Sequence, residues 1–246
     1  MSKLIVGNWK MNMDLNSISS FINEVDNFFS QTEVKNEVGV APSFPYLYEI
    51  KKCSNLKMVS QNVSEFNHGS YTGEVSAMQL KNMGCEYVIV GHSERRRLFG
   101  ENNELVRTKA VNVASENMNP IICVGETLEE KNSGITEEII RKQVSSSVPD
   151  LKLSRFIIAY EPVWSIGTGK VPSVSEVEFI SYLITEELKK LNSFENNAAI
   201  LYGGSVNSEN VDMLMAEPDV DGALVGGASL KPESFHLIMH FQGKNA

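Results

Sequence analysis

The sequence predicts an α/β protein in which the 246 residues form one domain, a closed barrel of eight parallel strands that alternate with helices. Short β-rich runs recur about every thirty residues, with helix-like segments between them. These runs are apolar almost throughout, which is typical of strands buried on both faces. No linker rich in proline, glycine or serine divides the chain, and single-domain barrels commonly reach this length.

Eight strand-helix units are the number that a (β/α)8 barrel needs. The alternative is an open, doubly wound sheet, which usually has a glycine-rich turn after its first strand, whereas this sequence has GNWKMN there. The predicted strands, in chain order, are KLIVGNW (3–9), EVGVAPS (37–43), KMVSQN (57–62), YVIVGH (87–92), PIICVG (120–125), RFIIAYE (155–161), AAILYGG (198–204) and DGALVGG (221–227).

The clearest predicted helix spans residues 173–191, where apolar residues keep helical spacing and Ser173 with Glu176 offers a capping box. The same reasoning predicts helices over residues 103–119 and 135–148. A shorter helix is predicted over residues 46–53.

Charge and cysteine content narrow the class of protein. A net charge of −9 argues against a nucleic-acid partner, and we interpret the one dense basic run, 95–97, as a helix face or an ion pair. The N-terminus lacks the features of a signal peptide, and no apolar run is long enough to cross a membrane. Cys53, Cys85 and Cys123 lack metal-binding spacing, which suits reduced structural thiols in a cytoplasmic enzyme.

Polar residues and glycines follow the predicted strands. Because the carboxyl ends of barrel strands converge on one mouth, residues that are distant in sequence become neighbours there. We therefore expect a polar ring formed by Asn8, Lys10, Ser43, Asn62, His92, Glu126, Glu161, Ser205, Gly226 and Gly227.

Seven motifs at these positions carry a family resemblance: GNWKMN, GSYTGEVS, GHSERRRLFGE, ICVGETLEE, AYEPVWSIGTGK, YGGSV and DGALVGGASL. In this order and spacing the chain resembles the triosephosphate isomerases from end to end. The resemblance implies a TIM barrel over residues 1–246 and the interconversion of dihydroxyacetone phosphate and D-glyceraldehyde 3-phosphate in glycolysis and gluconeogenesis, with neither a cofactor nor a metal. The chain departs from the family pattern at Ser165, where the family commonly has alanine, and in the stretch VPS after Lys170.

The resemblance also implies catalytic roles. Glu161 corresponds to the base, although an isolated Glu-Pro at a strand end would more simply be a solvated charge and a turn. His92 corresponds to the electrophile, as a neutral imidazole before a helix start. Lys10 would be the electrostatic anchor, Asn8 would hold Lys10 and the substrate, and Glu94 would tune Lys10 or His92.

Substrate binding is predicted at glycine-rich loops. Glycines after the seventh and eighth strands let backbone N–H groups approach a phosphate closely. We expect the phosphate site to include Gly167, Ser205, Gly226 and Gly227, with Leu224 as an apolar wall. Residues 163–170 are predicted to form a lid, with Trp164 in one hinge and Gly167 and Gly169 at its tip, whose closure places Ile166 against the carboxylate of Glu161.

Two other functions remain open at this point: an aldolase that uses Lys10 as a Schiff-base amine, and a scaffold built on an inactivated barrel. The intact set of Asn8, Lys10, His92 and Glu161 argues against a scaffold. The long polar segment 67–76 is either a disordered surface excursion or a functional loop. By resemblance it inserts beside the active site of a second subunit, which implies a homodimer. The acidic charge and the lack of a long apolar run indicate no nucleic-acid or membrane partner.

Overall fold

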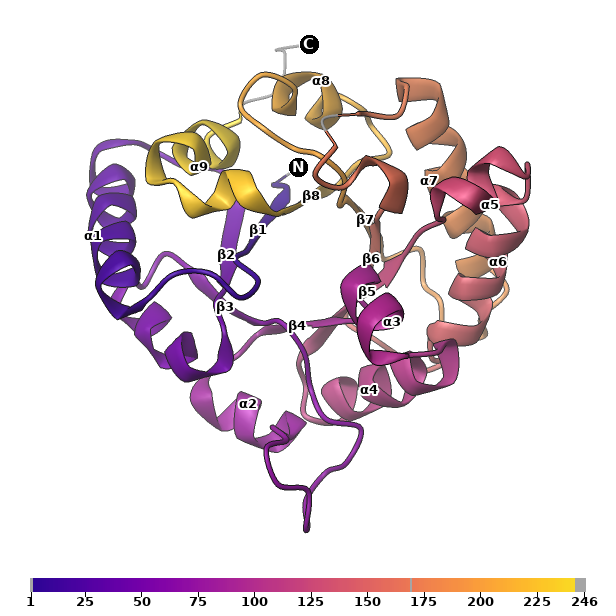
Figure 1. The fold of residues 1–246 in the computed structure, drawn as a ribbon, viewed down its shortest axis with the longest axis horizontal. Coiled ribbons are helices and arrows are strands. Elements are labelled where there is room, and N and C mark those ends of the chain that lie inside the picture. The colour runs from indigo at the N-terminus through magenta and orange to yellow at the C-terminus, as the bar shows by residue number, and fades with distance from the viewer. Residues whose placement is uncertain (1, 169, 242–246) are drawn as a thin grey trace.

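The chain folds as a closed barrel, in a computed structural model that describes residues 2–168 and 170–241. Within these residues eight parallel strands pair in sequence order, and β8 closes the barrel against β1 (Figure 1). The predicted (β/α)8 fold class is confirmed; the predicted domain limits, 1–246, include residues 1, 169 and 242–246, which lie outside the described part. The strands are β1 (Leu4–Asn8), β2 (Glu37–Ala41), β3 (Lys57–Ser60), β4 (Tyr87–Val90), β5 (Asn119–Val124), β6 (Phe156–Tyr160), β7 (Ala198–Tyr202) and β8 (Gly222–Val225).

Burial on both faces explains the apolar character of the strands. Alternate strand residues point to opposite faces of a sheet, so Leu4 and Val6 pack in one cluster while Ile5 packs in another. The first cluster collects residues from all eight strands and fills the barrel, and the second joins the strands to the surrounding helices. Cys53, Cys85 and Cys123 are buried, and none forms a disulfide within the described part of the chain.

Helices surround the barrel on all sides (Figure 1). The predicted capping box of Ser173 and Glu176 is present at the start of the longest predicted helix. The helical elements are α1 (Leu15–Gln31), η1 (Phe44–Lys52), α2 (Ala77–Met83), α3 (Ser93–Phe99), α4 (Asn103–Ser115), α5 (Leu128–Asn132), α6 (Thr136–Ser147), η2 (Val163–Ser165), α7 (Val174–Leu188), α8 (Val211–Met215), η3 (Gly227–Leu230) and α9 (Pro232–Met239).

Two helix predictions need correction. The segment 46–53, predicted as a helix, overlaps the 3-10 helix η1, which begins earlier, at Phe44, with a proline in its first turn, and ends at Lys52. The helix predicted over 103–119 ends at Ser115, because Asn117 has a left-handed backbone (φ 54°) that turns the chain into β5. Asparagine tolerates this conformation better than most residues, which explains the early end.

The segment 67–76 is an irregular loop that extends outward from the ring of helices, beyond α2 (Figure 1). The rings of Phe66 and Tyr71 stack at its base, with centroids 3.7 Å apart, and both side chains remain partly exposed. The stack joins the residue before the loop to the middle of the loop. Among the described residues, no helix has the length and apolar character needed to cross a membrane.

Candidate active site

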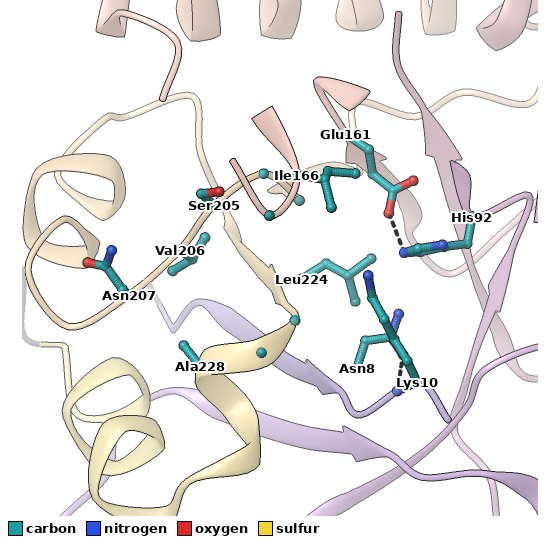
Figure 2. A pocket seen from close by; sticks show the side chains of 15 residues that line it. Asn8, Lys10, His92, Glu161, Ile166, Ser205, Val206, Asn207, Leu224 and Ala228 are labelled. Carbon is teal, nitrogen blue, oxygen red and sulfur yellow. Dashed lines mark hydrogen bonds and ion pairs between the residues drawn. The ribbon is translucent and has the colours of Figure 1, made fainter. Parts of the chain in front are cut away.

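A cavity of about 350 Å³ lies at the carboxyl ends of the strands (Figure 2). It brings together residues of β1 and β8 and of the loops that follow β1, β4, β6, β7 and β8. The predicted residues that line it are Asn8, Lys10, His92, Glu161, Ile166, Gly167, Ser205, Leu224, Gly226 and Gly227.

Other lining residues were not predicted. Val206 directly follows the predicted Ser205, Asn207 is the next residue, and Ala228 directly follows the predicted pair Gly226 and Gly227, which is the signal that could have found them. Of the expected polar ring, Ser43, Asn62 and Glu126 do not line this cavity. The amide oxygen of Asn62 instead accepts a hydrogen bond from Lys109 Nζ at 2.9 Å. Gly169, predicted at the tip of the lid, lies outside the described residues.

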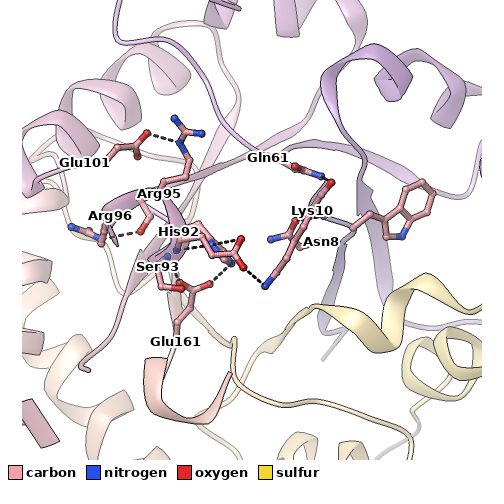
Figure 3. Close-up of polar contacts among 12 residues, drawn as sticks. Asn8, Lys10, Gln61, His92, Ser93, Arg95, Arg96, Glu101 and Glu161 are labelled. Atoms are coloured by element: carbon pink, nitrogen blue, oxygen red, sulfur yellow. Dashed lines mark hydrogen bonds and ion pairs between the residues drawn. The ribbon is translucent and has the colours of Figure 1, made fainter. Parts of the chain in front are cut away.

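Glu161 is buried, with only 2% of its surface exposed. Its carboxylate accepts a hydrogen bond from the backbone N–H of Ser93 at 2.8 Å and lies 3.0 Å from His92 Nε2 (Figure 3). Two glycines create this position: a Cβ on Gly125 would lie 1.7 Å from the carbonyl oxygen of Glu161, and one on Gly203 would lie 2.9 Å from its Cγ. The simpler interpretation of Glu161 as a solvated strand-end charge is therefore wrong.

Opposing influences act on the ionisation of Glu161. Burial raises its pKa, but the nearby His92, the Ser93 amide and the charge of Lys10 together hold the pKa below its usual value. The side chain is therefore a carboxylate at neutral pH, as a proton acceptor must be.

His92 caps the N-terminus of α3. Its Nδ1 accepts a hydrogen bond from the backbone N–H of Glu94 at 3.2 Å, so Nδ1 carries no proton and Nε2–H donates toward Glu161. Burial is the largest single influence on His92 and lowers its pKa, but the charge of Glu161, the hydrogen bond to Glu161 and the charge of Glu94 together outweigh it, so the pKa is raised overall. Because this upward shift depends on the contact with Glu161, it weakens when the carboxylate turns away.

Lys10 has an unusual left-handed backbone, with φ 54°. Three contacts hold it: its N–H donates to Asn8 Oδ1 at 3.1 Å, and its carbonyl accepts from Ser43 Oγ at 3.1 Å and Gln61 Nε2 at 2.8 Å (Figure 3). Asn8 thus holds the backbone of Lys10 rather than its ammonium group. Gln61 was not predicted, since a glutamine after a strand has no distinctive signal in the sequence.

The side chain of Lys10 crosses the mouth to Glu94, with 2.7 Å between Nζ and Oε1. Glu94 does not line the cavity, but its second carboxylate oxygen lies 3.7 Å from His92 Nδ1. The predicted contact of Glu94 with Lys10 or His92 is therefore present with both. Figure 3 shows Glu161 and Lys10 on either side of His92.

The glycine-rich side of the cavity has room for an anion. A Cβ added to Gly227 would meet nothing within 4 Å, and one added to Gly226 would lie 3.9 Å from Lys10 Cε. Leu224 belongs to the apolar barrel interior and also lines the cavity. Ser205 Oγ donates to the carbonyl of Ser165 at 2.7 Å, so one predicted phosphate-binding residue holds the lid in this structure.

Glu126 supports the lid and does not line the cavity. Its buried carboxylate accepts hydrogen bonds from Trp164 Nε1 at 2.7 Å and Tyr160 Oη at 3.2 Å. Burial raises the pKa of Glu126, and these two donors only partly offset the shift. In the described part of the chain, no group of three His, Cys, Asp or Glu side chains is placed to hold a metal ion.

The fold and the cavity define a barrel protein with a buried carboxylate–imidazole pair beside loops suited to an anion. The chain belongs to the triosephosphate isomerase family, because the family model for triosephosphate isomerase matches residues 3–242. Relatives named triosephosphate isomerase occur in Mycoplasmopsis pulmonis (42% identical over 246 residues, 97% of each chain) and Polynucleobacter asymbioticus (45% over 248 residues, 96% of this chain and 97% of the relative). A third, from Mesomycoplasma hyopneumoniae, is 40% identical over 245 residues, covering 97% of this chain and 99% of the relative.

Proposed function

We propose that this chain interconverts dihydroxyacetone phosphate and D-glyceraldehyde 3-phosphate. The observation that supports this function best is the buried pair of Glu161 and His92, 3.0 Å apart, in one cavity with Lys10. The reaction moves a proton between two adjacent carbons, which needs a base, a group that exchanges protons with the oxygens, and a fixed positive charge.

In the proposed mechanism the carboxylate of Glu161 removes a proton from C1 of dihydroxyacetone phosphate. The electrons of that C–H bond form the C1–C2 double bond, and the carbonyl electrons move to O2, which gives an enediolate. His92 donates the Nε2 proton to O2 and takes one from O1, whose electrons form the C1–O1 double bond. The electrons of the C1–C2 double bond then form the bond from C2 to the proton that Glu161 returns. All protons are thus conserved, and no oxidant is needed.

Electrostatics supports these roles. Lys10 lines the cavity together with the buried side chains of Glu161 and His92, where negative charge would develop, and the N–H groups at the start of α3 hold these two side chains. Gly226, Gly227, Gly167 and Ser205 would bind the phosphate through backbone N–H groups and a hydroxyl. Because Glu161 rests on the Ser93 amide, it must leave this hydrogen bond before it acts.

The assembly and location of the protein are part of the proposal. The exposed Phe66–Tyr71 stack and the outward loop 67–76 would pack beside the mouth of a second copy, giving a homodimer. We also propose that residues 1–246 act as one domain and that the enzyme works in the cytoplasm.

The decisive experiment measures isomerisation of dihydroxyacetone phosphate in a coupled assay, with wild type, Glu161→Gln and Glu178→Gln. Removing the base should lower kcat by about a thousandfold or more, with the affinity for 2-phosphoglycolate nearly unchanged. Glu178 lies on the exposed side of α7, so its variant should behave like wild type. Normal turnover by Glu161→Gln would refute the assignment of Glu161 as the base.

The same preparation tests the aldolase alternative. Borohydride should trap a Schiff base on Lys10 if that lysine is a covalent catalyst. Lys10 Nζ is instead held in an ion pair 2.7 Å from Glu94 Oε1, which suits an electrostatic role, so we expect no trapped adduct.

A further inference from the structure

Two buried hydroxyl groups near the lid have no hydrogen-bond partner among the described residues: Ser165 Oγ and Tyr202 Oη. Ser165 ends η2 in the first part of the lid, Tyr202 ends β7, and at most 1% of either residue is exposed. A buried hydroxyl without a partner costs folding free energy. An alanine at position 165 would avoid that cost, so the serine calls for an explanation.

The two hydroxyls meet above the backbone of Gly204. A Cβ built on this glycine would lie 2.2 Å from Tyr202 Oη and 2.7 Å from Ser165 Oγ, closer than any side chain could tolerate. Position 204 therefore needs glycine because the two oxygens occupy this space. Burial raises the pKa of Tyr202 to about 12 and the Ser165 hydroxyl acts against that shift, so the tyrosine is a protonated donor at neutral pH.

The main chain at Ser165 links the lid to the base. Its carbonyl accepts from Ser205 Oγ at 2.7 Å, and its N–H donates to the carbonyl of Pro162 at 2.8 Å. The proline directly follows Glu161, whose carboxylate rests on the Ser93 amide in this conformation. A movement at Ser165 is thus passed to the base through a short, stiff segment.

We propose that Ser165 is a positioning residue that holds the lid hinge in the described conformation by pairing its hydroxyl with Tyr202 Oη. Both oxygens already face the same space, so rotation of the serine side chain is the movement that would pair them. It joins the lid to β7 at a second point, beside the bond from Ser205. The effect of this pairing on catalysis rests on the proposed function. The hydrogen bond between Ser165 and Tyr202 does not depend on it.

The first test therefore uses no ligand. Amide hydrogen exchange of residues 165–168 is measured in wild type, Ser165→Ala, Tyr202→Phe and the double variant. Loss of one neutral hydrogen bond, about 1 kcal/mol, should accelerate exchange of the lid about fivefold in Ser165→Ala. In the Tyr202→Phe background the same change should have no further effect, because the partner is already gone.

Two results would overturn the proposal: equal acceleration by Ser165→Ala in both backgrounds, or no acceleration in either. Ser181→Ala, which removes another buried serine hydroxyl in the middle of α7, controls for a general loss of stability. If Tyr202→Phe does not fold, Ser165→Cys replaces it, since a thiol fills the space but bonds weakly. Wild-type exchange in this variant would mean that volume holds the hinge, against the proposal.

A second measurement connects the hinge to the site. Titration with 2-phosphoglycolate, followed by Trp164 fluorescence in a Trp9→Phe background, should give about fivefold tighter binding for Ser165→Ala, because less of the binding free energy is used to release the hinge. Unchanged or weaker binding, with faster lid exchange, would reject the link to closure and leave the isomerase function intact. An absence of turnover in wild type would instead count against the proposed function.

Discussion

At the residue scale, Lys10 supplies the positive charge that a dianionic ligand would need at the cavity of a protein that is acidic overall. Two hydrogen bonds to its carbonyl and one from its N–H maintain a backbone conformation that lysine seldom adopts. This local strain places the ammonium group beside the glycine-rich loops. The position of a single charge thus depends on Ser43 and Gln61, which come from two other parts of the chain.

Lys10→Met should weaken binding of 2-phosphoglycolate by about a hundredfold or more, because the variant keeps the length of the side chain and removes its charge from a partly buried site. Isothermal titration calorimetry measures the effect. Lys152→Met is the matched control: it removes the same charge from an exposed ion pair with Glu195. Equal affinity of the two variants would remove Lys10 from the binding site.

Glu126 should make stability depend on pH. Burial raises its pKa in the folded protein, so the folded state keeps the proton to higher pH than the unfolded state does. The contribution of Glu126 to stability is therefore fully present below the ordinary carboxyl pKa and is lost as pH rises through the raised, folded-state value.

Glu126→Gln removes this titration and keeps an oxygen for Trp164 Nε1. We expect the free energy of unfolding of the variant, relative to wild type, to increase between about pH 4 and pH 8. Urea unfolding across this range provides the measurement. A difference that stays constant with pH would show that burial does not perturb the carboxyl.

At the element scale, the lid is a short piece of chain whose two sides have different tasks. Trp164 donates a hydrogen bond to Glu126, and the Ser165 carbonyl accepts one from Ser205. The first part of the lid is therefore held against the barrel. Ile166 and Gly167 line the cavity, and Gly167 has a left-handed backbone (φ 70°) that favours glycine. The element can therefore move its apolar side chain while its first residues stay attached.

Ile166→Ala should reduce the exclusion of water around the enediolate without unfolding the protein, since Ile166 is only partly buried. We expect the ratio of methylglyoxal and inorganic phosphate to isomerised product to rise about tenfold, because an enediolate in contact with water loses phosphate before it is reprotonated. Val171→Ala removes carbon atoms from a partly buried residue after the lid and serves as the control. An unchanged product ratio would mean that Ile166 does not seal the site.

At the scale of the whole molecule, the exposed aromatic stack and the outward loop predict an assembly. Tyr71→Asp should convert a dimer into monomers, because a charge would replace a half-exposed ring at the expected interface. Sedimentation velocity measures the state, and activity should fall with dissociation. Tyr182→Asp, on the exposed face of α7, is the control and should leave assembly unchanged. A monomer with full activity would contradict a site that depends on its partner.

The barrel could be predicted because its signals are local. Each strand is a short apolar run, as in Ile121 and Ile122 of β5, and alternation between the two clusters requires apolar residues on both faces. The positions of Glu161, His92 and Lys10 after strands then follow, since parallel strands end at one mouth. Helix ends were predicted less well, as Asn117 shows, because one residue with a left-handed backbone decides where α4 stops.

By itself, the sequence determined the order of the elements, the family and the residues that meet at the mouth. The tertiary structure decided what each polar group contacts: Glu126 supports the lid, Asn62 binds Lys109, and Ser165 faces Tyr202. These partners are far apart in the chain, and distances of a few ångström between them arise only from the closure and packing of the barrel. A hydrogen bond depends on such distances, whereas an apolar strand depends mainly on composition, so the fold can be read from the sequence more readily than its polar contacts.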